Sequence, residues 1–115
     1  MTVDRRPGIA VIDVAGELDL NGAPALCAAI EEVRSPRDRD RVIVDLSRVG
    51  FCDSTGLRAL VNAAREVAIA GGRLVVIVPE EGPVRQVIRL TGAQEFLDVS
   101  ADRERVVAAR RTAGS

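Results

Sequence analysis

Two short, mainly apolar runs, VIVDL at residues 42–46 and LVVIV at residues 74–78, flank one long segment with helical periodicity. Apolar residues in that segment recur at spacings of three and four, the pattern of one buried helix face: Leu57, Leu60, Val61, Ala64, Val67 and Ala68. Apolar runs with a helix between them are typical of parallel strands that are buried on both faces and joined by a right-handed crossover. The chain therefore predicts an α/β fold.

The same alternation of strand and helix extends to both ends of the chain. Further strands are expected at a short N-terminal edge, in the β-branched stretch after it and near the C-terminus: residues 3–5, 9–14 and 96–99. Further helices are expected where a proline or a capping residue precedes an apolar stripe. One begins near Pro24 and carries Leu26, Ile30 and Val33, and a second begins at Pro83 and carries Val84, Val87 and Ile88. A third begins after Ser100, with Val106 and Val107 buried. A polar loop is expected at residues 35–41. The chain has no internal repeat, so one domain is predicted.

Composition excludes several classes of protein. A chain of 115 residues with a net charge of −1 has no strong electrostatic attraction to nucleic acid or to anionic lipid. Its longest continuous apolar runs are about five residues, whereas a membrane span needs about 20. The N-terminus lacks the apolar core of a signal peptide. We therefore expect a cytoplasmic protein with no nucleic-acid partner and no membrane partner.

The sequence contains no histidine, which removes the Ser-His-Asp triad and most zinc sites. Cys27 and Cys52 lack the spacing of metal ligands, and we expect both to be small buried hydrophobic residues. A hydrolase built around Ser54 would need an unusual general base, and none is suggested. The sequence therefore predicts a protein that is not an enzyme and that has no catalytic residue, no metal and no cofactor.

The junction between the first apolar run and the long helix holds Asp53-Ser54-Thr55-Gly56. Any of the first three can cap a helix N-terminus, so capping alone explains one of them. Three in a row are more than one helix start needs, and the free N–H groups there stabilise an anion. Gly56 weakens the first turn by roughly 1 kcal/mol relative to alanine, but its bare backbone would let another molecule approach Ser54. The junction therefore predicts either a helix cap or a place for a phosphate on Ser54.

Four stretches of the chain match a known pattern: Gly16-Glu17-Leu18-Asp19, Asp53-Ser54-Thr55-Gly56-Leu57, Gly71-Gly72-Arg73-Leu74, and Leu90-Thr91-Gly92 followed by Phe96. With them the chain, from about residue 3 to about residue 107, resembles the anti-sigma factor antagonists of the STAS domain family. The resemblance implies a single STAS-type domain over residues 1–115 with a loose tail after about residue 111. It also implies a mixed β-sheet of roughly four to five strands with about four α-helices.

The resemblance also implies a switch. In this family the unphosphorylated antagonist binds an anti-sigma factor, usually a serine kinase, and so releases the sigma factor. The kinase phosphorylates the serine directly after the motif aspartate, here Ser54, and a serine phosphatase resets the switch. Thr55 is the alternative acceptor. The resemblance places the partner-binding surface on the residues that match its two motifs and on the position after them: Asp19, Asp53, Ser54, Thr55, Gly56 and Arg58.

Alternatives remain open at several of these positions. Asp19 is equally well explained as a turn or cap aspartate. Arg58 could stabilise phosphoserine, pair with an acidic residue of the partner, or simply be solvated. Gly22 stands where the family usually has threonine at the start of the first helix, which predicts a slightly weaker cap. A STAS scaffold or accessory subunit of a stress-sensing or lipid-transport complex is the alternative function. We expect a monomer, because the predicted elements leave no exposed apolar stripe.

Overall fold

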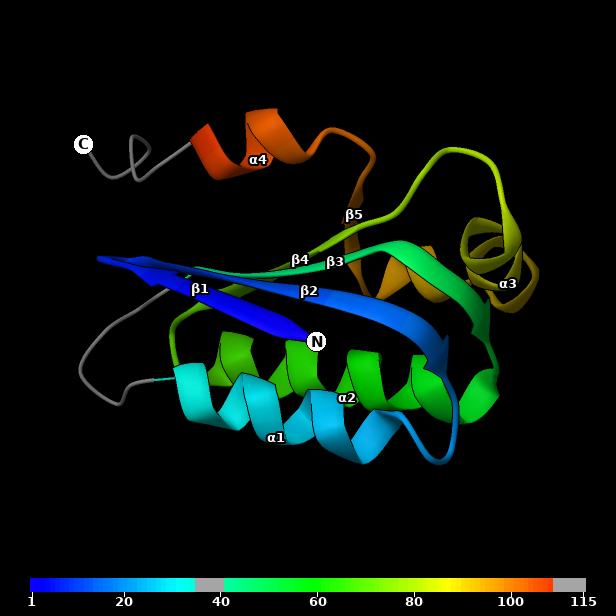
Figure 1. The fold of residues 1–115 in the computed structure, drawn as a ribbon, viewed down its shortest axis with the longest axis horizontal. Coiled ribbons are helices and arrows are strands. Elements are labelled where there is room, and N and C mark those ends of the chain that lie inside the picture. The colour runs from blue at the N-terminus through cyan, green and yellow to red at the C-terminus, as the bar shows by residue number, and fades with distance from the viewer. Residues whose placement is uncertain (35–40, 109–115) are drawn as a thin grey trace.

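The computed structural model describes residues 1–34 and 41–108 as one sheet with helices on both faces (Figure 1). The elements are, in chain order, β1 (Thr2–Arg6), β2 (Ile9–Leu18), α1 (Ala23–Val33), β3 (Arg41–Cys52), α2 (Ser54–Ile69), β4 (Arg73–Ile77), α3 (Pro83–Thr91), the 3-10 turn η1 (Ala93–Glu95), β5 (Asp98–Ser100) and α4 (Arg103–Ala108). The polar loop predicted at residues 35–41 and the tail predicted after residue 111 lie largely or wholly outside the described residues.

The sheet has five strands in the order β1-β2-β3-β4-β5. β1 pairs antiparallel with β2, and every later pair is parallel. The sheet is therefore mixed, as the resemblance implied. The apolar runs at residues 42–46 and 74–78 lie in β3 and at β4, and α2 connects these two parallel strands, which confirms the crossover predicted from the sequence.

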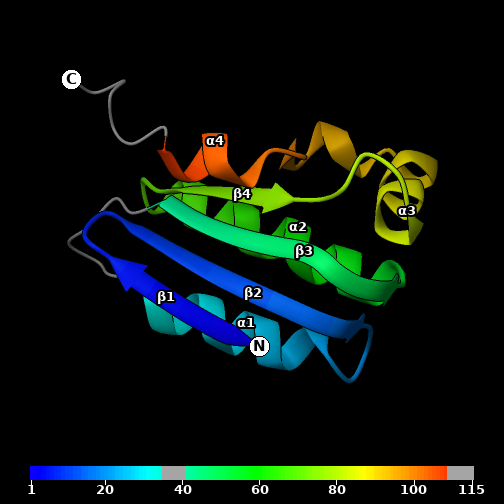
Figure 2. The ribbon, with the colours of Figure 1, turned by 45° about the horizontal axis from the view of Figure 1, so that its top comes forward.

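The helices make two layers of unequal size. α1 and α2 lie side by side across one face of the sheet, and the short α4 lies on the opposite face (Figures 1 and 2). The main core is between the sheet and the first layer, where Ile12, Val44 and Val76 of three neighbouring strands are buried in one cluster with Leu26 of α1 and Leu60 of α2. Of the face predicted for α2, Leu57, Leu60 and Val67 are buried and Val61 and Ala64 are half-buried. Ala68, which was predicted on the same face, is exposed near the end of the helix.

On the other face of the sheet, α4 covers a smaller apolar cluster, and ion pairs of its first residue, Arg103, attach it to the sheet. The sheet contributes Ile9, Val11, Ile43, Val75 and Ile77 to this cluster, and Val106 and Val107 of α4 pack against them. Arg103 bridges the carboxylates of Asp13 and the buried Asp45, donating to Asp45 Oδ2 at 2.7 Å. Burial raises the pKa of Asp45, but hydrogen bonds from Ser47 and Arg103 outweigh burial and hold that pKa below its usual value.

Several boundaries differ from the prediction. β3 does not end at Leu46 before a turn but continues to Cys52, because β2 continues beside it to Leu18. Between the pairs Asp13–Asp45 and Ala15–Arg48, and again between Gly16–Val49 and Glu17–Phe51, β3 has one residue more than β2. These register shifts break the regular alternation of side chains in the second half of β3. The last strand covers Asp98–Ser100 instead of residues 96–99.

The start of the last helix was also predicted wrongly. Ser100 belongs to β5 and does not cap α4; its hydroxyl oxygen accepts the N–H of Asp102. Asp102 is the residue whose side chain accepts from the first turn of α4, at Arg105 N. Val106 and Val107 are half-buried, not buried, because among the described residues α4 alone covers this face of the sheet, and it is short.

Candidate functional site

The predicted site lies where β2 and β3 end together. Leu18 and Cys52, the last residues of these strands, are paired in the sheet, and the N–H of Asp53 donates to the carbonyl oxygen of Leu18 at 3.3 Å. Parallel strands deliver their following loops to the same edge of the sheet. The loop that begins with Asp19 and the junction that begins with Asp53 are therefore neighbours.

Asp53 is the N-cap of α2. Its backbone is extended, its Oδ1 accepts the N–H of Gly56 at 2.9 Å, and its carbonyl oxygen accepts the N–H of Leu57 at 3.0 Å. The capping role that sequence reasoning left open among three residues therefore belongs to Asp53.

Ser54 and Thr55 are the first two residues of α2, and both are exposed. Neither hydroxyl takes part in a hydrogen bond within residues 1–34 and 41–108. The hydroxyl of Ser54 is consequently accessible, and its modification would break no hydrogen bond between described residues.

Gly56 has a different role from the one predicted. It is buried, and a Cβ atom built on it would lie 2.2 Å from the carbonyl oxygen of Leu18 and 2.9 Å from Leu18 Cγ. The expectation that Gly56 opens an approach to Ser54 is therefore wrong. Its lack of a side chain instead lets the first turn of α2 lie directly against the end of β2.

Asp19 organises the neighbouring loop. Its Oδ1 accepts the N–H groups of Asn21 and Gly22 at 3.0 and 2.9 Å, and its carbonyl oxygen accepts the N–H of Ala23 at 2.8 Å. The turn role of Asp19 is thus present. Gly22, where a weaker cap was predicted, lies so close to the chain that a Cβ atom would meet the carbonyl oxygen of Glu17 at 2.4 Å.

The two cysteines and Arg58 complete the surroundings of the junction. Cys52 is buried, and burial together with the charge of Asp53 raises the pKa of its thiol to about 11, so the thiol is neutral at physiological pH. Cys27 is half-buried, so the prediction that both cysteines are buried holds only for Cys52. Arg58 is exposed on α2 one turn beyond Ser54.

Sequence reasoning missed two apolar residues beside the junction. Leu20 and Phe51 are 69% and 50% exposed, and each stands within one or two residues of a predicted site residue. Other large exposed hydrophobic residues are spread over several elements: Met1, Val3, Ile69, Leu90 and Phe96. The only signal in the sequence was a large apolar residue next to a motif. The monomeric state stays a prediction.

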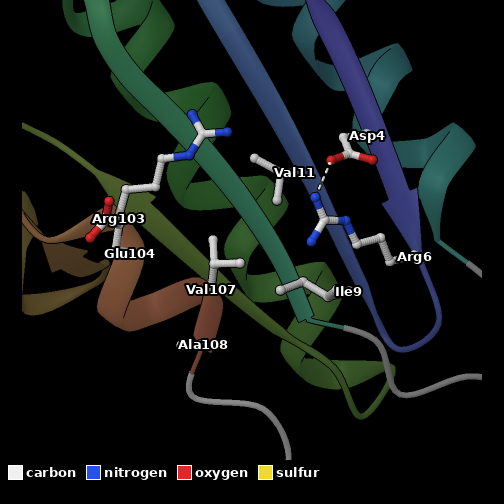
Figure 3. A pocket seen from close by; sticks show the side chains of 8 residues that line it. All are labelled: Asp4, Arg6, Ile9, Val11, Arg103, Glu104, Val107 and Ala108. Carbon is white, nitrogen blue, oxygen red and sulfur yellow. Dashed lines mark hydrogen bonds and ion pairs between the residues drawn. The ribbon is translucent and has the colours of Figure 1, made fainter.

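Two pockets lie away from the junction. Figure 3 shows the first, of about 270 Å³, between α4 and the strands β1 and β2, with Ile9, Val11 and Val107 on its walls and the Arg6–Asp4 ion pair at its rim. The second, of about 310 Å³, borders the Asp13–Asp45–Arg103 cluster. Neither is lined by a predicted site residue. In the described part of the chain no group of acidic residues and cysteines is arranged to hold a metal ion, and no helix is long and apolar enough to cross a membrane.

Comparison with known proteins identifies the family to which this fold belongs. A family model described as "Mlab, STAS domain" matches residues 1–99. BtrV of Bordetella bronchiseptica, which carries the name of a candidate anti-sigma factor antagonist, is 30% identical over 114 residues, 98% of this chain and 96% of BtrV. The chain belongs to the STAS domain family.

Solved structures agree with the assignment of this STAS domain. An anti-sigma factor antagonist from Mycobacterium paratuberculosis is 30% identical and superposes with a TM-score of 0.79 over 96% of this chain and 92% of that chain. SpoIIAA of Bacillus, in its unphosphorylated form, is 22% identical, with a TM-score of 0.73 over 99% of this chain and 96% of that chain. Known anti-sigma factor antagonists therefore share the fold of this STAS domain from one end to the other.

Proposed function

We propose that this STAS domain is an anti-sigma factor antagonist whose binding is switched off by phosphorylation of Ser54. The observation that carries the proposal is that the hydroxyl of Ser54, directly after the capping Asp53, is exposed and has no hydrogen-bond partner in the part of the chain that the structure describes. Relatives that match nearly the whole chain and are named as antagonists support the class of function. In the unphosphorylated state the junction binds an anti-sigma factor, and the sigma factor is released.

The charge change at Ser54 explains how the switch works without refolding. A phosphate adds about 1.5 to 2 negative charges at neutral pH. The carboxylate of Asp53 lies in the adjacent residue, so the junction changes from a mixed surface to a strongly acidic one. Because the Ser54 hydroxyl holds no part of the fold, the phosphoprotein keeps its structure. Binding is lost at the contact itself, by charge and bulk.

The remaining site residues support this role. Asp53 fixes the start of α2 and thereby the position of Ser54, and Gly56 seats that start against β2. Asp19 shapes the adjoining part of the surface. Thr55 is the alternative acceptor. The protein acts as substrate of a serine kinase and later of a serine phosphatase, and it is not itself a catalyst.

The test is intact-mass spectrometry after incubation with ATP and each kinase-type anti-sigma factor encoded in the same genome. Ser54→Ala and Thr55→Ala are compared with the wild type. We expect one phosphate on the wild type and on Thr55→Ala, and none on Ser54→Ala. No phosphate with any of these kinases would contradict the proposal and favour the scaffold function, in which Ser54 only begins a helix.

A further inference from the structure

Arg58 is a cation without a charged neighbour on its own helix. The residues three and four positions away, which face it along an α-helix, are Ser54, Thr55, Val61 and Asn62, and none carries a charge. Arg58 is exposed, and it makes no hydrogen bond or ion pair within the described part of the chain. Its guanidinium is therefore available to an anion that arrives later.

The carboxylates near the start of α2 already have partners. Asp53 accepts the N–H of Gly56, and Asp19 accepts two N–H groups of its own loop. Farther along α2, Glu66 pairs with Arg34 of α1 at 3.5 Å. None of these acids pairs with Arg58.

We propose that Arg58 receives the phosphate of phosphoserine 54. Side chains at positions i and i+4 of a helix lie about 5 to 6 Å apart at Cβ, and the order with the anion first is the favourable one. The planar guanidinium offers paired N–H donors that match two phosphate oxygens. Asp53 lies directly before Ser54 and repels the phosphate, whereas Arg58 lies one turn after Ser54 and attracts it. The phosphate is therefore directed toward Arg58.

This inference rests on the proposed function, and it names the regulation of the same residue. In the unphosphorylated protein Arg58 is an exposed cation one turn after Ser54, without a charged partner among residues 1–34 and 41–108. After phosphorylation, the phosphate on Ser54 and the guanidinium of Arg58 bind each other. The surface therefore loses an accessible hydroxyl and an accessible guanidinium in one step.

The test measures the second pKa of the phosphate by ³¹P NMR in a protein carrying phosphoserine at position 54, incorporated during translation. No kinase is needed, so the result is independent of whether an anti-sigma factor phosphorylates Ser54. The variants are Arg58→Gln, Arg58→Lys and, as a matched control, Arg65→Gln. Arg65 is also exposed on α2, but it is 11 residues from Ser54, roughly 16 Å along the helix and beyond the screening length of about 8 Å.

Pairing with Arg58 favours the dianionic phosphate and lowers its pKa. From helical ion pairs we expect the pKa to be about 0.3 lower in the wild type than in Arg58→Gln. Arg58→Lys keeps the charge but loses the paired donors, so it should retain only part of this difference, and Arg65→Gln should match the wild type. Equal values in the wild type and Arg58→Gln, with circular dichroism showing both folded, would overturn the inference while leaving phosphorylation of Ser54 untouched.

Discussion

Replacing Gly56 with alanine tests the packing of the site most sharply. The added methyl would stand 2.2 Å from the carbonyl oxygen of Leu18, and that oxygen is held in place by the N–H of Asp53. The overlap is with backbone, so no flexible side chain can move aside to relieve it. The start of α2 must instead move away from the end of β2.

The magnitude follows from two opposing effects. Overpacking a well-packed site costs about 1 to 3 kcal/mol, and alanine recovers about 1 kcal/mol of helix propensity relative to glycine. Because the clash is with fixed backbone, we expect Gly56→Ala to lower the free energy of unfolding by about 2 kcal/mol. For a domain of this size that is a fall in Tm of roughly 8 °C.

The assay is urea unfolding followed by circular dichroism, with Gly50→Ala as the matched control. Gly50 is exposed in β3 and does not have a positive φ, and a Cβ atom added to it would meet nothing within 4 Å. Alanine there should leave stability unchanged or raise it by up to about 1 kcal/mol. A Gly56→Ala protein as stable as the wild type would refute the view that α2 begins in close contact with Leu18.

Three further outcomes are expected from the contacts of the site and the core. Asp53→Ala removes the cap of α2 and should lower the free energy of unfolding in urea by about 1 kcal/mol. Ser54→Ala should change that free energy by less than about 0.5 kcal/mol. Equal losses in the two variants would contradict the assignment of Asp53 as the cap. The pKa of Asp45 is lower in the folded protein than in the unfolded chain, where it is about 3.9. The stability that this carboxylate contributes is therefore present above the unfolded pKa and is lost as the pH falls through the folded pKa. At pH values below about 4 the urea midpoint of unfolding should fall, and it should fall less steeply in Asp45→Asn. The neutral, buried thiol of Cys52 should resist a thiol reagent at pH 8 in the folded protein and react after unfolding, and rapid reaction in the folded protein would contradict its burial.

The parts of the fold with strong local periodicity were predictable from the sequence. The runs at residues 42–46 and 74–78 and the helix between them are local patterns, and their parallel pairing follows from the crossover rule. The extension of β3 to Cys52 was not predictable in this way. Its residues include Gly50 and the exposed Phe51, and the two extra residues in β3 relative to β2 remove the alternation that would have marked a strand.

The place of the candidate site in the fold, at the start of a helix that follows a strand, was predictable, but the contacts of its members were not all predictable. The acidic, hydroxyl-bearing junction was identified from its place between a strand and a helix. Gly56 was misjudged because its neighbour, Leu18, is 38 residues earlier in the chain and comes close only through the sheet. The Arg103–Asp45 contact spans 58 positions and has no local signal at all. Tertiary contacts of this kind determine which polar residues are committed to the fold and which are free.

In the proposed switch, one phosphate on Ser54 ends binding to the anti-sigma factor. The most direct measurement is isothermal titration of the anti-sigma factor that phosphorylates Ser54 with three proteins: Ser54→Ala, Thr55→Ala, and the protein carrying phosphoserine at position 54. We predict binding by both alanine variants and an affinity at least about tenfold weaker for the phosphoserine protein, a difference of roughly 1.4 kcal/mol. Equal affinities for Ser54→Ala and the phosphoserine protein would contradict the account.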